Sequence, residues 1–156
     1  YFCYYKSTKF NLMNDDYLKY WRVIRYFVKA KYNLSQGELD VLMFLNSEGH
    51  FGQEKFDEFN ELLSWDKGRF KRLLRDGWIQ VFRKRCGPTK TLYILSYKSK
   101  RLILSIYKKL SGEEIPTSLS GNPMFAKNVK YTDKVYRNFI IEMNAFIRQQ
   151  RHRAPE

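Results

Sequence analysis

The sequence predicts a mainly α-helical fold with one small β-ribbon, and three observations support this prediction. Apolar residues recur at spacings of three and four over most of the chain, the spacing changes to two between Trp78 and Leu95, and capping residues precede several helical stretches. With 156 residues and 44% hydrophobic content, the chain is long enough for one core. We therefore expect a single domain over residues 14–150, with an arm at 1–13 and a tail at 151–156.

The first three predicted helices precede the ribbon. Residues 14–31 begin with Asn and two Asp and then place apolar residues at helical spacing. Ser35 and Glu38 have the spacing of a capping box, which predicts that a second helix starts there and runs to Asn46. In residues 53–63, phenylalanines and leucines alternate with acidic residues, so the third helix should have an acidic outer face.

A fourth helix is expected over residues 66–76, after a brief break in the helical pattern. At 100° per residue, Phe70, Leu73 and Leu74 cluster on one side, which should face the core. The opposite side is almost wholly cationic, with Gly68 at its centre. Two interpretations of this glycine stay open: it lets a partner approach the helix closely, or it belongs to an imperfect first turn.

After the fourth helix, the pattern predicts two strands and then helices again. Gly77 is expected to cap the helix, and strands over 78–83 and 92–95 should flank a turn at Cys86–Lys90. Helices are then expected over residues 97–111 and 133–150. Between them, the stretch GEEIPTSLSGNP, with two Pro and two Gly, has the composition of a linker.

The charge distribution points to a polyanionic partner. The formal net charge is +13, residues 33–65 carry one basic and seven acidic side chains, and residues 66–90 carry nine basic and two acidic ones. A merely solvated surface would mix the two signs more evenly. We therefore interpret 66–90 as a binding face, with nucleic acid as the first candidate partner.

Three helices followed by a basic helix and a ribbon are typical of a winged helix-turn-helix, here over residues 34–96. In such a fold the basic helix enters the major groove of double-stranded DNA, and the ribbon, called the wing, contacts phosphates or the minor groove. Arg69 and Arg72 are our candidates for base edges. The full set of candidate DNA-binding residues is Lys67, Gly68, Arg69, Lys71, Arg72, Arg75, Arg83, Lys84, Arg85 and Lys90.

At this point the chain resembles the MarR family of winged-helix transcription regulators. The resemblance rests on LSQGELDVLMFL (34–45), RLLRDGWIQVFRKR (72–85) and LYILSYKSKRLILSIYKKLSGEEIP (92–116). It implies a DNA-binding transcriptional regulator that forms a homodimer through helices at 14–31, 97–111 and 133–150, with any small-molecule effector unknown. The implied dimerisation residues are Leu18, Trp21, Ile24, Phe27, Ile106, Leu110, Val135, Phe139, Met143 and Phe146. The same apolar stripes also fit an intramolecular core, and that alternative stays open.

A second hypothesis is a non-enzymatic winged-helix module of a phage or mobile element, which binds protein or nucleic acid without reading sequence. Two features favour it. The wing of the resembled family usually carries an Asp-x-Arg pair near its tip, whereas this tip reads CGPTKT, with Arg85 and Lys90 as the only substitutes. The acidic face predicted for residues 53–63 would also lie near the DNA backbone.

Other functional classes find little support in the residues. Cys3 and Cys86 are too few for a disulfide framework, and we expect free thiols. Neither histidine, His50 or His152, has a neighbour at metal-ligand spacing, and no catalytic motif occurs, so we expect no metal, no cofactor and no enzyme. No apolar run is long enough to span a membrane, and no signal peptide is recognisable, so we expect a cytoplasmic protein.

Overall fold

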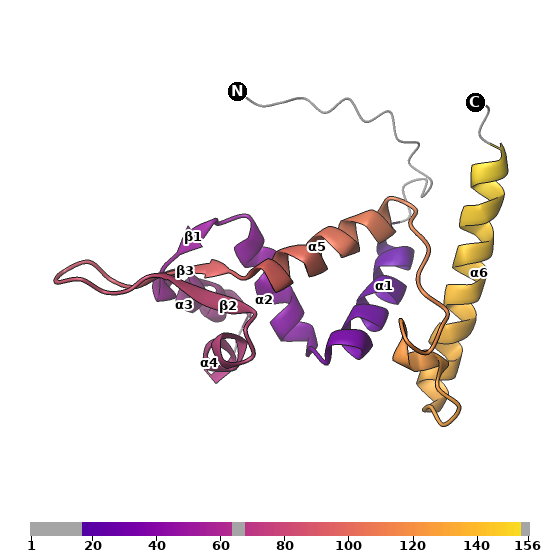
Figure 1. The fold of residues 1–156 in the computed structure, drawn as a ribbon, viewed down its shortest axis with the longest axis horizontal. Coiled ribbons are helices and arrows are strands. Elements are labelled where there is room, and N and C mark those ends of the chain that lie inside the picture. Colours follow the sequence, from indigo (N-terminus) through magenta and orange to yellow (C-terminus); the bar gives the residue numbers. More distant parts are fainter. Residues whose placement is uncertain (1–16, 64–67, 154–156) are drawn as a thin grey trace. The chain divides into compact units, whose positions relative to one another are not determined.

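The structure is a computed structural model that describes residues 17–63 and 68–153. Within these ranges the chain forms six α-helices, a short 3-10 helix and one three-stranded antiparallel sheet (Figure 1). The elements are α1 (Tyr17–Tyr32), α2 (Gln36–Asn46), β1 (His50–Phe51), α3 (Gln53–Leu63), α4 (Gly68–Arg75), β2 (Ile79–Arg83), β3 (Leu92–Leu95), α5 (Tyr97–Leu110), the 3-10 helix η1 (Pro123–Phe125) and α6 (Tyr131–Arg153). The predicted mainly helical fold with a small sheet is confirmed, and it is compatible with a winged helix.

The described helices lie where the periodicity predicted them. α6 continues to Arg153, so the first residues of the expected tail are helical. The arm expected at 1–13 and the break expected near residues 64–65 lie outside the described residues. Contacts divide the chain into two compact units, one comprising Tyr1–Lys31 with Ile106–Glu156 and the other Tyr32–Ser105.

The sheet of the 32–105 unit has the strand order β1-β3-β2. Phe51 pairs with Tyr93 on one side of β3, and Val81 pairs with Tyr93 on the other. The predicted ribbon of two strands is therefore incomplete, because β1 adds a third strand. β1 has only two residues, which is too short to produce a recognisable alternation in the sequence.

One face of this sheet packs on helices through aromatic side chains. The ring centroids of Phe51 and Tyr93 lie 6.3 Å apart, and Phe70 of α4 meets Tyr93 edge-on at 4.9 Å. Phe56 of α3 lies 5.0 Å from Phe70. Phe51, Phe56 and Phe70 are all buried, so α3 and α4 are fixed to the same side of the sheet.

Local hydrogen bonds set the ends of α2 and α4 as the sequence predicted. Ser35 caps α2 through the N–H of Glu38, and the Glu38 side chain accepts from the N–H of Ser35 in return. Gly77, with φ +77°, ends α4: its N–H donates to Leu74, and the N–H of Trp78 donates to Leu73. The chain therefore turns directly from α4 into β2.

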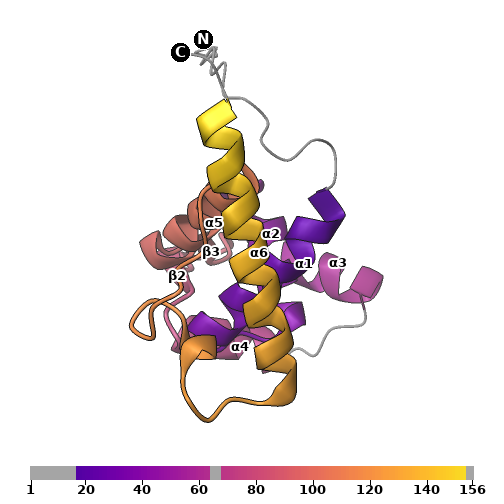
Figure 2. The same cartoon turned by 90° about the vertical axis from the view of Figure 1, so that its right-hand side faces the viewer.

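In the other unit, α6 is a single unbroken helix of 23 residues (Figure 2). Its buried positions include Ile140, Met143 and Ile147. Near its start, Tyr136 stacks on Tyr26 of α1 with ring centroids 3.8 Å apart, and the Tyr26 hydroxyl donates to Asp133 at 2.5 Å. Burial and this bond to a carboxylate raise the pKa of Tyr26 to about 12, so its hydroxyl stays protonated.

The segment whose composition suggested a linker is held in place by buried amides. Asn144 of α6 accepts from the Ile115 N–H at 3.0 Å and donates to the Ile115 carbonyl at 2.8 Å. Asn122 donates to the carbonyl of Pro116 and caps η1. Ile115 is itself buried, so the prediction of a linker is wrong here. The backbone N–H and C=O of this residue are hydrogen-bonded by an asparagine side chain of α6, and the composition of the segment does not reveal that contact.

Candidate nucleic-acid interface

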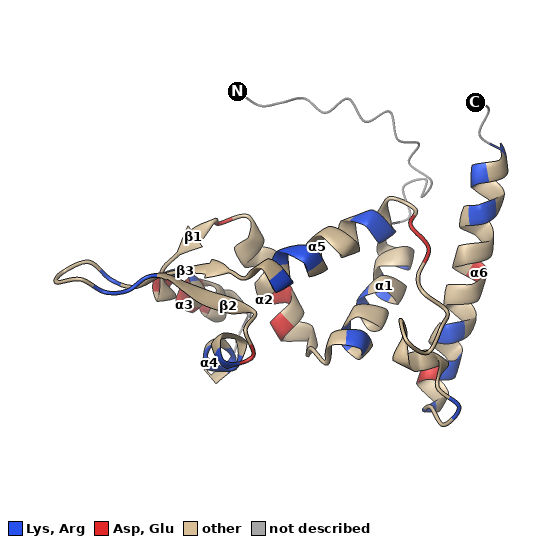
Figure 3. Cartoon of the chain, viewed as in Figure 1, with Lys and Arg blue, Asp and Glu red and all other residues tan. Residues whose placement is uncertain are grey.

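The helix α4 presents cations on the side opposite its buried residues. Phe70 and Leu73 are buried, whereas Lys71, Arg72 and Arg75 are exposed. Figure 3 shows the Lys and Arg positions of α4 in blue. This confirms the predicted core-facing side. Gly68 is the first residue of the described helix, and Lys67, also a candidate contact, lies outside the described residues. The exposed side of α4 is therefore cationic, as a helix that contacts phosphates requires.

Arg69 lies elsewhere than predicted. We expected it to point toward base edges, but it is half-buried and its guanidinium packs on Gly37 in the first turn of α2. A β-carbon at Gly37 would overlap this guanidinium. The absence of a side chain at Gly37 thus lets Arg69 bridge α4 to α2, which gives it a structural contact within the unit.

Arg72 is exposed but ion-paired. Its Nε lies 3.4 Å from Oε1 of Glu38, whose side chain is only 14% exposed. The other carboxylate oxygen of Glu38 accepts the Ser35 N–H at 2.9 Å, so the capping box holds this carboxylate in position. The residue that we expected to read bases is therefore paired with the start of α2 in the absence of a partner.

The wing, residues 79–95, places its cations in solvent. Arg83, Lys84, Arg85 and Lys90 are all exposed. Its turn closes through a pair of backbone hydrogen bonds between Cys86 and Thr89, and the Arg85 Nε donates to the Gly87 carbonyl at 3.3 Å. The tip is thus a closed turn with an exposed thiol at Cys86.

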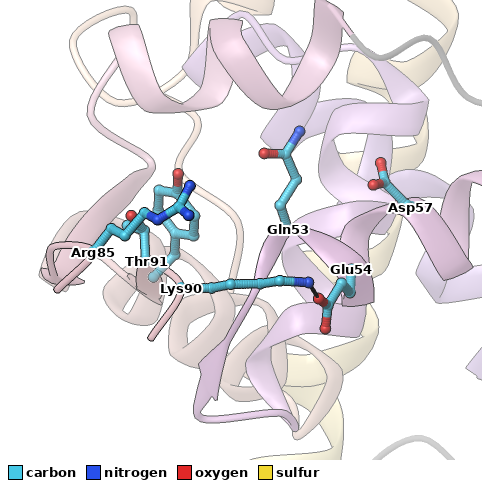
Figure 4. A pocket seen from close by; sticks show the side chains of 7 residues that line it. Gln53, Glu54, Asp57, Arg85, Lys90 and Thr91 are labelled. Carbon is cyan, nitrogen blue, oxygen red and sulfur yellow. Dashed lines mark hydrogen bonds and ion pairs between the residues drawn. The ribbon is translucent and has the colours of Figure 1, made fainter. Parts of the chain in front are cut away.

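Lys90 reaches back from the wing to α3, where it forms an ion pair with Glu54 (Figure 4). Both side chains are more than two-thirds exposed, so this pair contributes little to stability. Within α3 itself, Lys55 pairs with Glu58 at 3.1 Å, and this pairing raises the pKa of Lys55. The predicted acidic face of α3 therefore lies against the wing at one end.

A hollow of about 330 Å³ opens between α3 and the wing. Its lining combines both signs of charge with neutral polar groups: Gln53, Glu54, Asp57, Arg85, Lys90, Thr91 and Tyr93. Among the described residues, Oδ1 of Asp57 is buried without a hydrogen-bond partner. The volume lies at the lower end of the range of small-molecule sites. The two cations in this lining, Arg85 and Lys90, are also candidate DNA-binding residues, so the hollow belongs to the candidate interface.

The acidic partners Glu38 and Glu54 were missed by the sequence analysis, as was Gly37. A signal was present, because an acidic block at 33–65 directly precedes a basic block at 66–90. Opposite blocks within one small unit can pair with each other as well as with external charges. The sequence could not say which cations would be paired.

The candidate dimerisation residues divide into three groups by burial. Ile24, Phe27, Ile106 and Met143 are buried within the chain, so the prediction that they form a contact between subunits is wrong for a chain folded in this way. Trp21, Leu110 and Val135 are half-buried. Leu18, Phe139 and Phe146 are exposed, at 82%, 47% and 39%. The intramolecular core thus accounts for the first group, and the exposed side chains retain the most surface for a partner.

In the described part of the chain, no helix combines the length and the apolar character needed to cross a bilayer. Residues 17–63 and 68–153 contain no cluster of three or more His, Cys, Asp or Glu side chains able to hold a metal ion. Cys3, the other predicted free thiol, lies outside these ranges. Comparison with protein-family models, curated proteins and solved structures finds no match to this chain, so the resemblance to the MarR family stays a prediction.

Proposed function

We propose that this chain is a winged helix-turn-helix protein that binds double-stranded DNA. In this proposal α3 and α4 form the helix-turn-helix, α4 enters the major groove, and the β2–β3 hairpin is the wing. The observation that carries it is the set of exposed cations on both α4 and the wing, which belong to one compact unit: Lys71, Arg72, Arg75, Arg83, Lys84 and Arg85. A surface with this charge favours phosphates as ligands.

The contacts of the individual cations support different roles. Lys71, Arg75 and the wing arginines are exposed and suit phosphate contacts. Arg72 would read a guanine edge after exchanging Glu38 for the base, since one guanidinium can bind O6 and N7 together. We propose that Arg69, which packs on Gly37, orients α4 and does not read bases.

We further propose that the protein regulates transcription as a homodimer, in line with its resemblance to the MarR family. The exposed apolar residues Leu18, Phe139 and Phe146 are the best candidates for the subunit contact. Exposed phenylalanines on one helix are unusual in a monomer and are common in interfaces. Light scattering on the full chain tests this, because a Phe139→Glu, Phe146→Glu double variant should be monomeric if α6 forms the contact.

A salt titration of duplex binding tests the DNA proposal. The affinity should fall steeply with salt, because each phosphate contact releases a counterion. Arg72→Ala should weaken binding to a selected duplex about 5- to 150-fold, which corresponds to about 1–3 kcal/mol, and should relax base preference. Lys71→Ala should weaken binding to all sequences alike. Lys55→Ala is the matched control, since Lys55 is exposed on α3 and already pairs with Glu58.

A second candidate function is favoured by the acidic residues of α3. Glu54, Glu58 and Glu61 are exposed, and Glu54 contacts the wing, so a duplex at the wing would meet negative charge. This arrangement suits a module that binds a protein, or nucleic acid without sequence readout. Equal affinity for random and selected duplexes, or binding that is insensitive to salt, would favour this module over the regulator.

A further inference from the structure

The sheet has a second face, opposite the one that packs on α3 and α4. Phe51 and Tyr93 point toward α3 and α4, and side chains of adjacent residues point to opposite faces of a strand. His50 and Ile94 therefore lie on the other face, which we call the outer face. His50 is exposed, whereas Ile94 is half-buried although it pairs with His50 on one side and Gln80 on the other.

Two aromatic rings cover Ile94 on this outer face. The His50 imidazole from β1 and the Phe82 ring from β2 meet across β3, with centroids 3.9 Å apart and planes 20° apart. An irregularity in the register between Val81 and Arg83 interrupts the alternation of β2 at Phe82. Phe82 remains 54% exposed despite the stack. Each ring uses one face for the other ring, and since both residues remain exposed, a further planar group can stack on them.

The charge beside this stack restricts which planar group fits. Phe82 is followed directly by Arg83, Lys84 and Arg85, all exposed. From Ile79 to Leu95 the chain carries four basic residues and no acidic one. An aromatic platform beside successive cations binds a ligand that has both flat rings and negative charge, and a nucleotide has both. An apolar protein partner would leave these three cations without a counter-charge.

We propose that the His50–Phe82 pair is a stacking site for an unpaired base of single-stranded nucleic acid, whose backbone follows Arg83, Lys84 and Arg85. The base continues the stack on the free face of a ring, and the neighbouring phosphates contact the cations. The site takes any base, because every base has a π-face. This function goes beyond the reading of a duplex by α4 and does not depend on it.

Binding of a fluorescein-labelled thymidine oligonucleotide, followed by anisotropy on the full chain, tests the proposal. Phe82→Ala should weaken binding about 5- to 150-fold, the range found when one stacking aromatic is removed. Phe82→Tyr should bind within about twofold of the parent because it retains the ring. Val81→Ala is the matched control, since Val81 is an exposed apolar residue of the same strand.

A second readout reports stacking itself. An oligonucleotide that contains 2-aminopurine should lose fluorescence on binding to the parent and to Phe82→Tyr, and should keep it with Phe82→Leu, which retains apolar volume without a ring. Circular dichroism and urea midpoints of each variant verify folding. Equal affinity of Phe82→Leu and the parent, with no quenching in either, would overturn the proposal. So would a Phe82→Ala variant whose only change is altered self-association in light scattering.

The outcome can be separated from that of the duplex proposal. Arg72→Ala should weaken binding to a duplex and leave the thymidine oligonucleotide unaffected, because Arg72 lies on α4 beside Glu38 and not on the outer face. If the parent chain binds the thymidine oligonucleotide but no duplex, only the duplex proposal is refuted. Loss of quenching with intact duplex binding refutes only the stacking site.

Discussion

Replacing Glu38 with Gln separates two roles of one carboxylate. Glu38 accepts the N–H of Ser35 in the capping box and pairs with Arg72 of α4. Gln occurs at the same capping position and can keep the first contact, so the helix start should persist. The negative charge is removed, so Arg72 no longer forms its ion pair with this side chain. We therefore expect Glu38→Gln to bind duplex DNA more tightly than the parent.

The expected gain in duplex affinity follows from the exposed fractions of the two paired side chains. Arg72 and Glu38 are separated by 3.4 Å, and their side chains are 43% and 14% exposed. Ion pairs near the surface contribute about 0.2–1 kcal/mol, and the low exposure of Glu38 places this one near the upper limit. The affinity should therefore rise about two- to fivefold, since 1.4 kcal/mol corresponds to a factor of ten. The free energy of unfolding should fall by less than about 1 kcal/mol.

Anisotropy titrations with one duplex at about 50 and about 200 mM salt measure this effect, and the gain should shrink at the higher concentration because salt screens exposed charges. Asp40→Asn is the matched control. Asp40 lies on the same helix as Glu38, but its carboxylate accepts from the Gln36 side chain, at 3.1 and 3.2 Å. The reasoning is refuted if Glu38→Gln binds no more tightly than Asp40→Asn, or if it loses affinity while remaining folded.

Three further predictions concern other contacts. Glu54→Gln should release Lys90 and raise duplex affinity by up to about fivefold, since both side chains are exposed. Asn144→Ala should lower the free energy of unfolding by about 2–4 kcal/mol, because it leaves a buried backbone N–H and C=O without partners. The Arg148 guanidinium holds the pKa of Glu114 below its ordinary value of 4.5, so the stability that this pair contributes is present above that value and is lost as the pH falls through the lowered pKa. Glu114→Gln should therefore flatten the acid limb of the stability profile.

Each of these predictions has a matched control. Glu58→Gln removes a carboxylate from α3 that pairs with Lys55, so it should change duplex affinity less than the Glu54 variant does. Asn138→Ala alters an exposed asparagine of α6 and should leave the urea midpoint almost unchanged. Glu142→Gln, at an exposed position, should leave the acid limb as it is in the parent. Equal effects of variant and control would show that the contact named is not responsible.

The sequence by itself determined the local structure of the chain. The capping box at Ser35 and the glycine at position 77 predicted helix ends that the structure has, and the spacing of Phe70 and Leu73 predicted the core-facing side of α4. These features depend on hydrogen bonds and side-chain periodicity within a few residues, so the local sequence contains the information. The change of spacing after Gly77 predicted β2 and β3 for the same reason.

Contacts between segments far apart in the sequence were decided by the tertiary structure alone. β1 is too short for a pattern, and it becomes a strand because β3 offers it hydrogen-bond partners. Arg69 packs on Gly37 because two helices approach closely at that point, and the stack of His50 on Phe82 requires β3 to lie between two edge strands. Asn144 orders a segment whose composition predicted a linker. In each case the stabilising free energy comes from groups that meet only when the chain has folded. The spacing of residues in the sequence therefore does not predict these contacts.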